Sequence, residues 1–162
     1  MSRDFTFKSL IAVSAAFVIL VSMGRFSPGE AKPEDPSVSS LDAPFSLAGE
    51  WKIAIGDDAN YAAPGFNDAE WDTVNLPGNL MTRVIAKTTG LARTEGVVWL
   101  RKTIRIDQNL PREDLGLVLG RIGNADETYF NGTRIGAMGE FEPDAHSMWN
   151  HPRYYTISRD FV

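Results

Sequence analysis

Apolar side chains recur at every second position in several short stretches of this chain, the pattern of half-buried β-strands. The longest stretch covers residues 96–106 and sets four apolar residues on one face: Val98, Leu100, Ile104 and Ile106. Shorter alternating stretches cover residues 45–55, 74–76 and 115–119, with Gly, Pro and Asn corners between them. Many short strands with such corners predict an all-β sandwich or jelly roll.

The clearest local signal is a hairpin around Asn131-Gly132. Its predicted arms are residues 127–130 and 133–135. Asn and Gly are the residues that best tolerate the positive φ angles of a type I′ turn, so we expect a two-residue loop. The hairpin follows the corner Gly123-Asn124-Ala125-Asp126.

The N-terminal region shows a different pattern. Residues 9–24 carry no charge and follow Arg3 and Lys8. As a helix this segment spans about 24 Å, which suits an export signal or a short membrane anchor. We expect residues 1–24 to be a signal peptide or an anchor, with cleavage and retention both open, and the protein to be exported, periplasmic or extracytoplasmic.

Residues 25–44 hold four of the nine prolines together with Ser, Glu and Asp. Such a composition buries too little apolar surface to offset chain entropy, so we expect a disordered linker. The folded domain is expected to cover residues 45–162.

Composition narrows the chemistry. The net charge of −5 argues against a nucleic-acid surface. Cysteine is absent, which excludes disulfides, thiolate metal sites and a cysteine nucleophile. The two histidines are His146 and His151.

Four segments together resemble a known module: LAGEWKIAIGDD, FNDAEWDTVNLPG, EGVVWLRKTIRID and LGLVLGRIGNADETYFNGTRIGAMGEF. They are similar to the N-terminal sugar-binding jelly roll of glycoside hydrolase family 2. The same galactose-binding-like module occurs in bacterial sialate esterases and periplasmic sensor proteins. The resemblance implies a galactose-binding-like β-sandwich without catalytic residues, because the family's catalytic glutamates lie on a separate (β/α)₈ barrel of about 250 residues.

Residues 151–157 resemble the next-to-last strand of that module. The final strand of the module has no counterpart before Val162. The resemblance therefore implies a jelly roll that lacks its final strand. We expect a fragment of a longer protein or a truncated gene product.

Acidic and imidazole side chains offer no convincing reactive or metal site. The pairs Asp57-Asp58, Glu113-Asp114 and Glu140-x-Glu142 lie in predicted turns, where solvated acids are ordinary. His146, His151 and Asp144 are loop residues without a ligand spacing. We predict no catalytic residue, no metal site and no cofactor. A structural calcium ion held by three aspartates is the alternative left open: Asp57, Asp58 and Asp68.

A sugar site needs an aromatic face and planar polar side chains. Trp149 is the tryptophan least explained by a strand pattern, and six polar residues complete the candidate set: His146, Asn150, Asn124, Asp126, Arg101 and Arg153. Other roles stay open for several of them. Arg153 could pair with an acid of the domain, Asp126 could cap a turn, and Trp149 could contact another domain. The remaining tryptophans are expected in the core: Trp51, Trp71 and Trp99.

These observations predict a non-catalytic carbohydrate-binding or accessory domain linked to carbohydrate metabolism. The expected partners are a carbohydrate, or a missing C-terminal catalytic or signalling domain, with no nucleic acid. An uncleaved N-terminal segment would add contact with the membrane through residues 9–24. The alternatives are an extracytoplasmic sensor or interaction domain of a membrane signalling protein, or a truncated remnant without function.

Overall fold

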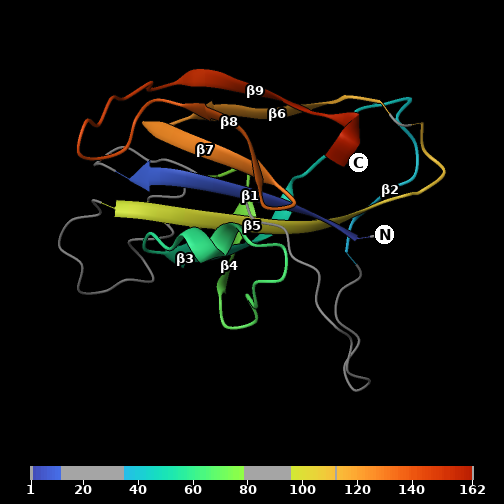
Figure 1. Ribbon diagram of the computed structural model, residues 1–162, viewed down its shortest axis with the longest axis horizontal. Helices are drawn as coiled ribbons and strands as arrows, with labels where there is room; N and C mark the ends of the chain where they lie inside the picture. Colours follow the sequence, from blue (N-terminus) through green and yellow to red (C-terminus); the bar gives the residue numbers. More distant parts are fainter. Residues whose placement is uncertain (1, 12–34, 79–95, 112, 162) are drawn as a thin grey trace.

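The protein is an all-β sandwich. The computed structural model describes residues 2–11, 35–78, 96–111 and 113–161. Figure 1 labels the strands, which are β1 (Ser2–Ile11), β2 (Ser37–Val38), β3 (Gly49–Ile55), β4 (Asp72–Leu76), β5 (Gly96–Ile106), β6 (Leu115–Ile122), β7 (Ala125–Phe130), β8 (Thr133–Met138) and β9 (His151–Ile157). The helical elements in these ranges are two 3₁₀ turns, η1 (Ala59–Ala62) and η2 (Arg159–Phe161).

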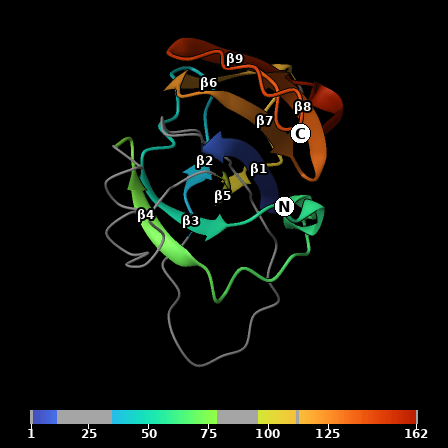
Figure 2. The same ribbon diagram turned by 90° about the vertical axis from the view of Figure 1, so that its left-hand side faces the viewer.

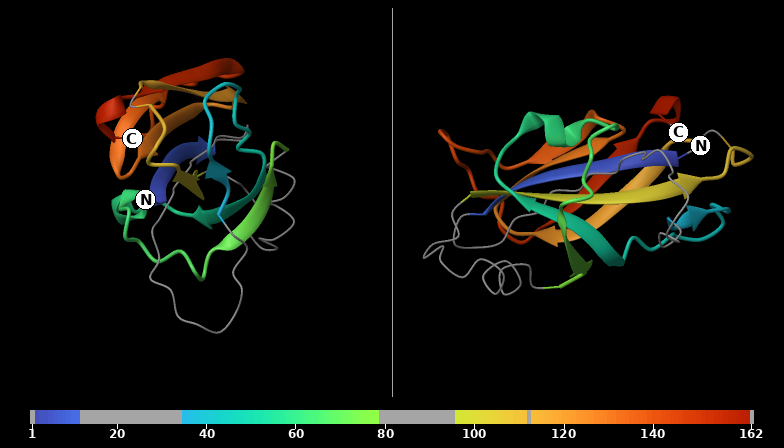
Figure 3. Two further views of the ribbon diagram at one scale, coloured as in Figure 1. Left: turned by 90° about the vertical axis from the view of Figure 1, so that its right-hand side faces the viewer. Right: turned by 90° about the horizontal axis from the view of Figure 1, so that it is seen from below.

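The strands form a large curled sheet and a strand pair. The large sheet has the order β4-β3-β5-β1-β7-β8, and β2 pairs in parallel with β5. The pair consists of β6 and β9, which run antiparallel. The large sheet curls so that β7 and β8 approach the β6–β9 pair, as Figures 2 and 3 show from two sides. This arrangement confirms the predicted all-β sandwich.

Strand β5 is the central element of the core. Its bounds, Gly96–Ile106, are those predicted from the alternating pattern. Both faces of the strand are buried from Val98 to Lys102, because the loop 56–71 covers the face that carries Trp99 and Arg101. The other face joins the main core with residues from four further strands: Trp51, Val74, Leu117, Ile122 and Ile157.

Lys102 interrupts the apolar face of β5, and it is nevertheless buried, with only 7% of its surface exposed. Its Nζ donates to the carbonyl oxygens of Ala48 (3.3 Å) and Glu50 (3.1 Å). The ammonium lies 5.2 Å from the centre of the Trp51 ring. Burial lowers the pKa of Lys102, and Glu50 counteracts that shift. These contacts explain how the core holds a cation at an otherwise apolar position.

The predicted hairpin is present as β7 and β8, joined by Asn131 and Gly132. Both turn residues have positive φ, 48° and 80°, as a type I′ turn requires. The arms are longer than predicted because pairing continues to Asp126 and Met138.

The N-terminal region differs from its prediction where it is described. Ser9–Ile11 belong to β1, so the apolar helix expected over residues 9–24 does not begin there, and residues 12–24 lie outside the described ranges. Phe5 and Phe7 alternate with polar residues in the sequence, and β1 pairs with β5 on one edge and β7 on the other. Among the described residues, no helix has the length and apolar character needed to cross a membrane.

Part of the expected linker also joins the sandwich. Ser37 and Val38 pair with Arg105 and Ile106 of β5. The side chain of Val38 is buried in the main core. A single apolar residue inside a proline-rich stretch gives too weak a periodic signal to predict this contact. The domain boundaries at residues 24 and 44 stay predictions.

Candidate functional site: the Trp149 loop

Four of the seven predicted site residues belong to two neighbouring connections, and Arg153 in β9 is hydrogen-bonded to both. The first connection, residues 139–150 between β8 and β9, is called here the Trp149 loop and is the orange-red loop at the left of Figure 1. The second is the corner at residues 123–124 between β6 and β7. Asp126 lies two residues further on, at the start of β7.

Backbone hydrogen bonds fasten the Trp149 loop to the corner. Glu140 and His146 form a two-way bridge, with N···O distances of 2.9 and 3.1 Å. The Met148 N–H donates to the Asn124 carbonyl at 2.8 Å, and the Ser147 hydroxyl donates to the Asn124 side-chain oxygen at 2.8 Å. The loop is therefore held at several points before β9 begins.

Arg153 completes this attachment from inside the sandwich. Its guanidinium is fully buried and donates to four backbone carbonyls, two in or beside the Trp149 loop and two in the corner. The acceptors are His151 (2.6 Å), Met148 (3.2 Å), Gly123 (3.3 Å) and Asn124 (3.4 Å). The five donors of an arginine suit this task because they point in several directions from one rigid plane.

Asp126 balances the charge of Arg153. Its carboxylate accepts from Arg153 Nε, from the Tyr155 hydroxyl at 2.6 Å and from the Thr128 hydroxyl at 3.4 Å. Burial raises the pKa of Asp126, and the hydrogen bonds from Tyr155 and Arg153 counteract that shift. Burial and the neighbouring carboxylate raise the pKa of Tyr155. The cluster is a closed structural network inside the sandwich.

The outer side of the loop is open to solvent. The Trp149 side chain is 63% exposed. Its neighbour Asn150 adopts φ 61°, a left-handed conformation that asparagine tolerates better than most residues. Three further polar side chains of this region are exposed: Asp144, His146 and His151. The result is a solvated aromatic side chain with imidazole and amide groups nearby in the chain.

This arrangement suits binding better than catalysis. A sugar ring can stack on an exposed indole, while amide and imidazole groups can hydrogen-bond to its hydroxyls. No group of three or more metal-ligating side chains occurs in the described ranges. Of the three aspartates considered for calcium, Asp58 caps η1 and Asp68 forms an ion pair with Arg101 at 2.9 Å.

The structure separates the predicted site residues into exposed and internal ones. Trp149, His146 and Asn150 are exposed on the loop. The other four predicted residues are buried: Asn124, Asp126, Arg153 and Arg101. For Arg153, the sequence left open a pairing with an acid of the domain instead of a ligand contact, and the Arg153–Asp126 ion pair is such a pairing. The three remaining tryptophans lie in packed regions, with Trp51 and Trp99 buried and Trp71 half-buried.

Arg101 lies apart from the Trp149 loop. It holds the loop 56–71 against β5 by donating to the carbonyls of Tyr61, Ala63 and Pro64 and by pairing with Asp68. Tyr155 and Thr128, which complete the Asp126 network, were not among the predicted site residues. The two-residue period of β9 sets Arg153, Tyr155 and Ile157 on one face and is the signal that could have identified Tyr155.

Comparison with known proteins shows sequence similarity to part of a carbohydrate-active enzyme. It is 24% identical over 139 residues to Beta-galactosidase BoGH2A of Bacteroides ovatus, a match that covers 76% of this chain and 16% of that enzyme. The chain thus corresponds to a small part of its relative's length. No family model matches the sequence. No solved structure matches it either. The similarity relates the chain to one part of a β-galactosidase.

Proposed function

We propose that this chain is a non-catalytic carbohydrate-binding accessory domain, and that the Trp149 loop is its sugar-contacting surface. The observation that carries the proposal is the 63% exposure of Trp149 on a loop that a buried ion pair fastens from within. An exposed indole on an ordered loop offers an apolar ring face on which a sugar ring can stack.

Preorganisation strengthens this interpretation. Binding costs free energy when loops and side chains must be ordered at the same time. The hydrogen bonds that Arg153 donates and those that Asn124 accepts order the Trp149 loop without a ligand. An indole held on such a loop can contact a sugar ring with little further loss of entropy.

The non-catalytic part of the proposal rests on size and placement. The similarity to the β-galactosidase covers 16% of that enzyme. Glycoside hydrolysis needs two carboxyl groups about 5 to 9.5 Å apart across one bound sugar. The acids of the Trp149 loop are exposed: Glu140, Glu142 and Asp144. We expect no turnover of aryl glycosides, and turnover that a single acidic substitution abolishes would contradict this part of the proposal.

The binding surface can be tested by substitution. Trp149→Ala should abolish binding to a panel of β-galactosides and plant or bacterial glycans, because the stacking face is removed. Its melting temperature should stay near that of the wild type, since the side chain is largely solvated. Tyr154→Ala is the matched control, because Tyr154 is 66% exposed but lies within β9.

Two results would contradict the proposed surface. Glycan binding that survives in Trp149→Ala would place the sugar elsewhere. A large loss of stability in Trp149→Ala, with no glycan bound by the wild type, would make Trp149 a structural residue.

A further inference from the structure

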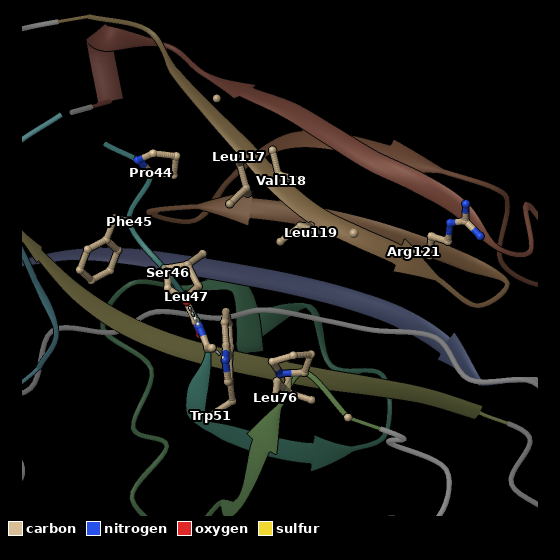
Figure 4. A pocket seen from close by; sticks show the side chains of 15 residues that line it. Pro44, Phe45, Ser46, Leu47, Trp51, Leu76, Leu117, Val118, Leu119 and Arg121 are labelled. Carbon is tan, nitrogen blue, oxygen red and sulfur yellow. Dashed lines mark hydrogen bonds between the residues drawn. The ribbon is translucent and has the colours of Figure 1, made fainter. Parts of the chain in front are cut away.

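A groove runs along β6 on the side of the sandwich opposite to its partner strand. In the described ranges β6 pairs with β9 on one edge and with no strand on the other. Two adjoining cavities of about 600 and 470 Å³ lie along that second edge. They share the lining residues Pro44, Phe45, Leu47, Gly116, Leu117 and Val118. Figure 4 shows the residues 44–47 facing β6 across the larger cavity.

The groove is apolar along its length and charged at its ends. Glu113 and Asp114 directly precede β6 and line one cavity, whereas Arg121 near the end of β6 lines the other. Between them the lining is mostly aliphatic and aromatic. A sugar would find few hydrogen-bond partners here, which makes the groove a poor second carbohydrate site.

The rim of the groove presents apolar side chains to solvent. Val118 is 65% exposed and Phe45 is 40% exposed. An unpaired strand edge with apolar neighbours is a template for pairing with another strand. Such an edge calls for an occupant that supplies backbone hydrogen bonds and covers apolar surface together.

A bulge in β6 limits the register in which another strand can pair with it. Val118 pairs with Tyr154 and Gly120 pairs with Arg153, so Leu119 is an extra residue in a bulge. Added Cβ atoms at Gly116 and Gly120 would meet no atom within 4 Å. The free edge therefore has open space at two glycine positions, on either side of the exposed Val118.

We infer that β6 pairs antiparallel with β6 of a second copy of this chain, about a twofold axis at Leu117. With Leu119 counted as the bulge residue, this register sets Gly116 of one copy opposite Val118 of the other, and Leu115 opposite Gly120. In each pair a large residue meets a glycine.

The same register also matches the charges. Asp114 of one copy lies opposite Arg121 of the other, and the twofold axis repeats the pair. Opposite charges at paired positions stabilise antiparallel strands, and like charges destabilise them. This self-complementarity in size and charge favours a second copy over an unrelated peptide.

The association should be weak. One strand pair and the flanking groove residues form an interface at the small end of the range for specific complexes, below about 1,200 Å². The dimer should therefore depend on protein concentration. Sedimentation velocity up to about 1 mM protein detects dissociation constants in the millimolar range and below.

Charge exchange gives the decisive experiment. Arg121→Asp and Asp114→Arg should each be monomeric, because each sets like charges opposite one another. An equimolar mixture of the two variants should form a heterodimer, since both opposed pairs are again of opposite charge. Arg134→Asp, an exposed arginine on β8, makes the same charge change as Arg121→Asp and should leave the dimer intact.

The mixture also controls for folding. Asp114 Oδ1 accepts a hydrogen bond from the Arg159 N–H at 2.9 Å, so Asp114→Arg alone could lose dimer through local unfolding. Recovery of the heterodimer shows that both variants are folded and that the charges are opposed. Val118→Lys should also abolish the dimer. It should not lower the melting temperature, because the Val118 side chain is exposed in the monomer.

Three results would overturn the inference. One is a wild-type protein that stays monomeric up to about 1 mM. Another is a dimer that Arg121→Asp and Val118→Lys leave intact. The third is a mixture in which well-folded variants form no heterodimer.

Discussion

The buried pair of Arg153 and Asp126 is the residue-scale feature on which the proposed site depends. Both side chains have no exposed surface, and the guanidinium holds carbonyls of the Trp149 loop and of the corner. The sequence suggested Arg153 as a ligand residue because it is a planar polar side chain beside aromatic residues. Its partner Asp126 lies 27 residues away in the sequence. The local sequence pattern therefore could not show whether Arg153 binds a ligand or pairs with an acid inside the domain.

Adjacent acids on β7 allow a contrast between buried and exposed ion pairs. Asp126→Asn leaves Arg153 as an uncompensated buried cation, and the free energy of unfolding should fall by about 3 to 5 kcal/mol. Glu127→Gln removes the ion pair with Arg134, whose side chain is 56% exposed, while the glutamine amide oxygen can still accept from the Tyr129 hydroxyl, so the change should cost about 1 kcal/mol or less. Urea denaturation measures both. Equal losses in the two variants would show that the Asp126 pair is not the fastening element.

Tyrosine ionisation gives a pH test of the same network. Burial and the carboxylates that accept from their hydroxyls raise the pKa values of Tyr155 and Tyr129. An acid whose pKa is raised by folding stabilises the folded state below its unfolded pKa, about 10 for tyrosine, and loses that contribution as the pH rises above it. Stability should therefore decline above about pH 10. The tyrosinate absorbance of Tyr155 and Tyr129 should then appear only with unfolding, and ionisation of every tyrosine in the folded protein would contradict the burial.

At the scale of elements, local pattern predicted the strands well where both faces obey a two-residue period. β5 has its predicted bounds, and the β7–β8 turn has the predicted residues. The prediction of strands was weaker where contacts with residues distant in the sequence determine the local structure. β1 lies between β5 and β7, although its sequence runs into a long apolar segment that suggested a helix. β2 consists of two residues and has no local signal of its own.

The packing of β8 against β9 leads to a testable prediction at this scale. A Cβ atom added at Gly136 would lie 2.0 Å from the ring of Tyr155. Gly136→Ala should therefore cost about 1 to 3 kcal/mol and disturb the hydrogen bond from Tyr155 to Asp126. Gly65→Ala is the matched control, because an added Cβ there meets no atom within 4 Å. Thermal unfolding of both variants measures the difference, and equal stability would show that β9 can move away from β8.

At the scale of the whole molecule, the sandwich buries its charged anchors and exposes an aromatic loop, and β6 has an edge without a partner strand in the described ranges. The all-β class follows from the sequence because alternating strands and turn residues are local signals. The separation of predicted site residues into exposed and internal ones is not local, since it depends on which faces the curled sheet covers. Similarity to part of a β-galactosidase adds a carbohydrate context, and the choice of Trp149 as contact residue comes from its exposure.

The most direct test of the proposed function is an NMR titration of the indole N–H signals with a glycan that the panel identifies. The chain has four tryptophans, and Trp149→Phe assigns the signal of interest. Addition of glycan should shift the Trp149 signal progressively and leave those of Trp51 and Trp99 nearly unchanged, because both are buried. A glycan that binds and shifts other signals while the Trp149 signal stays fixed would contradict the account.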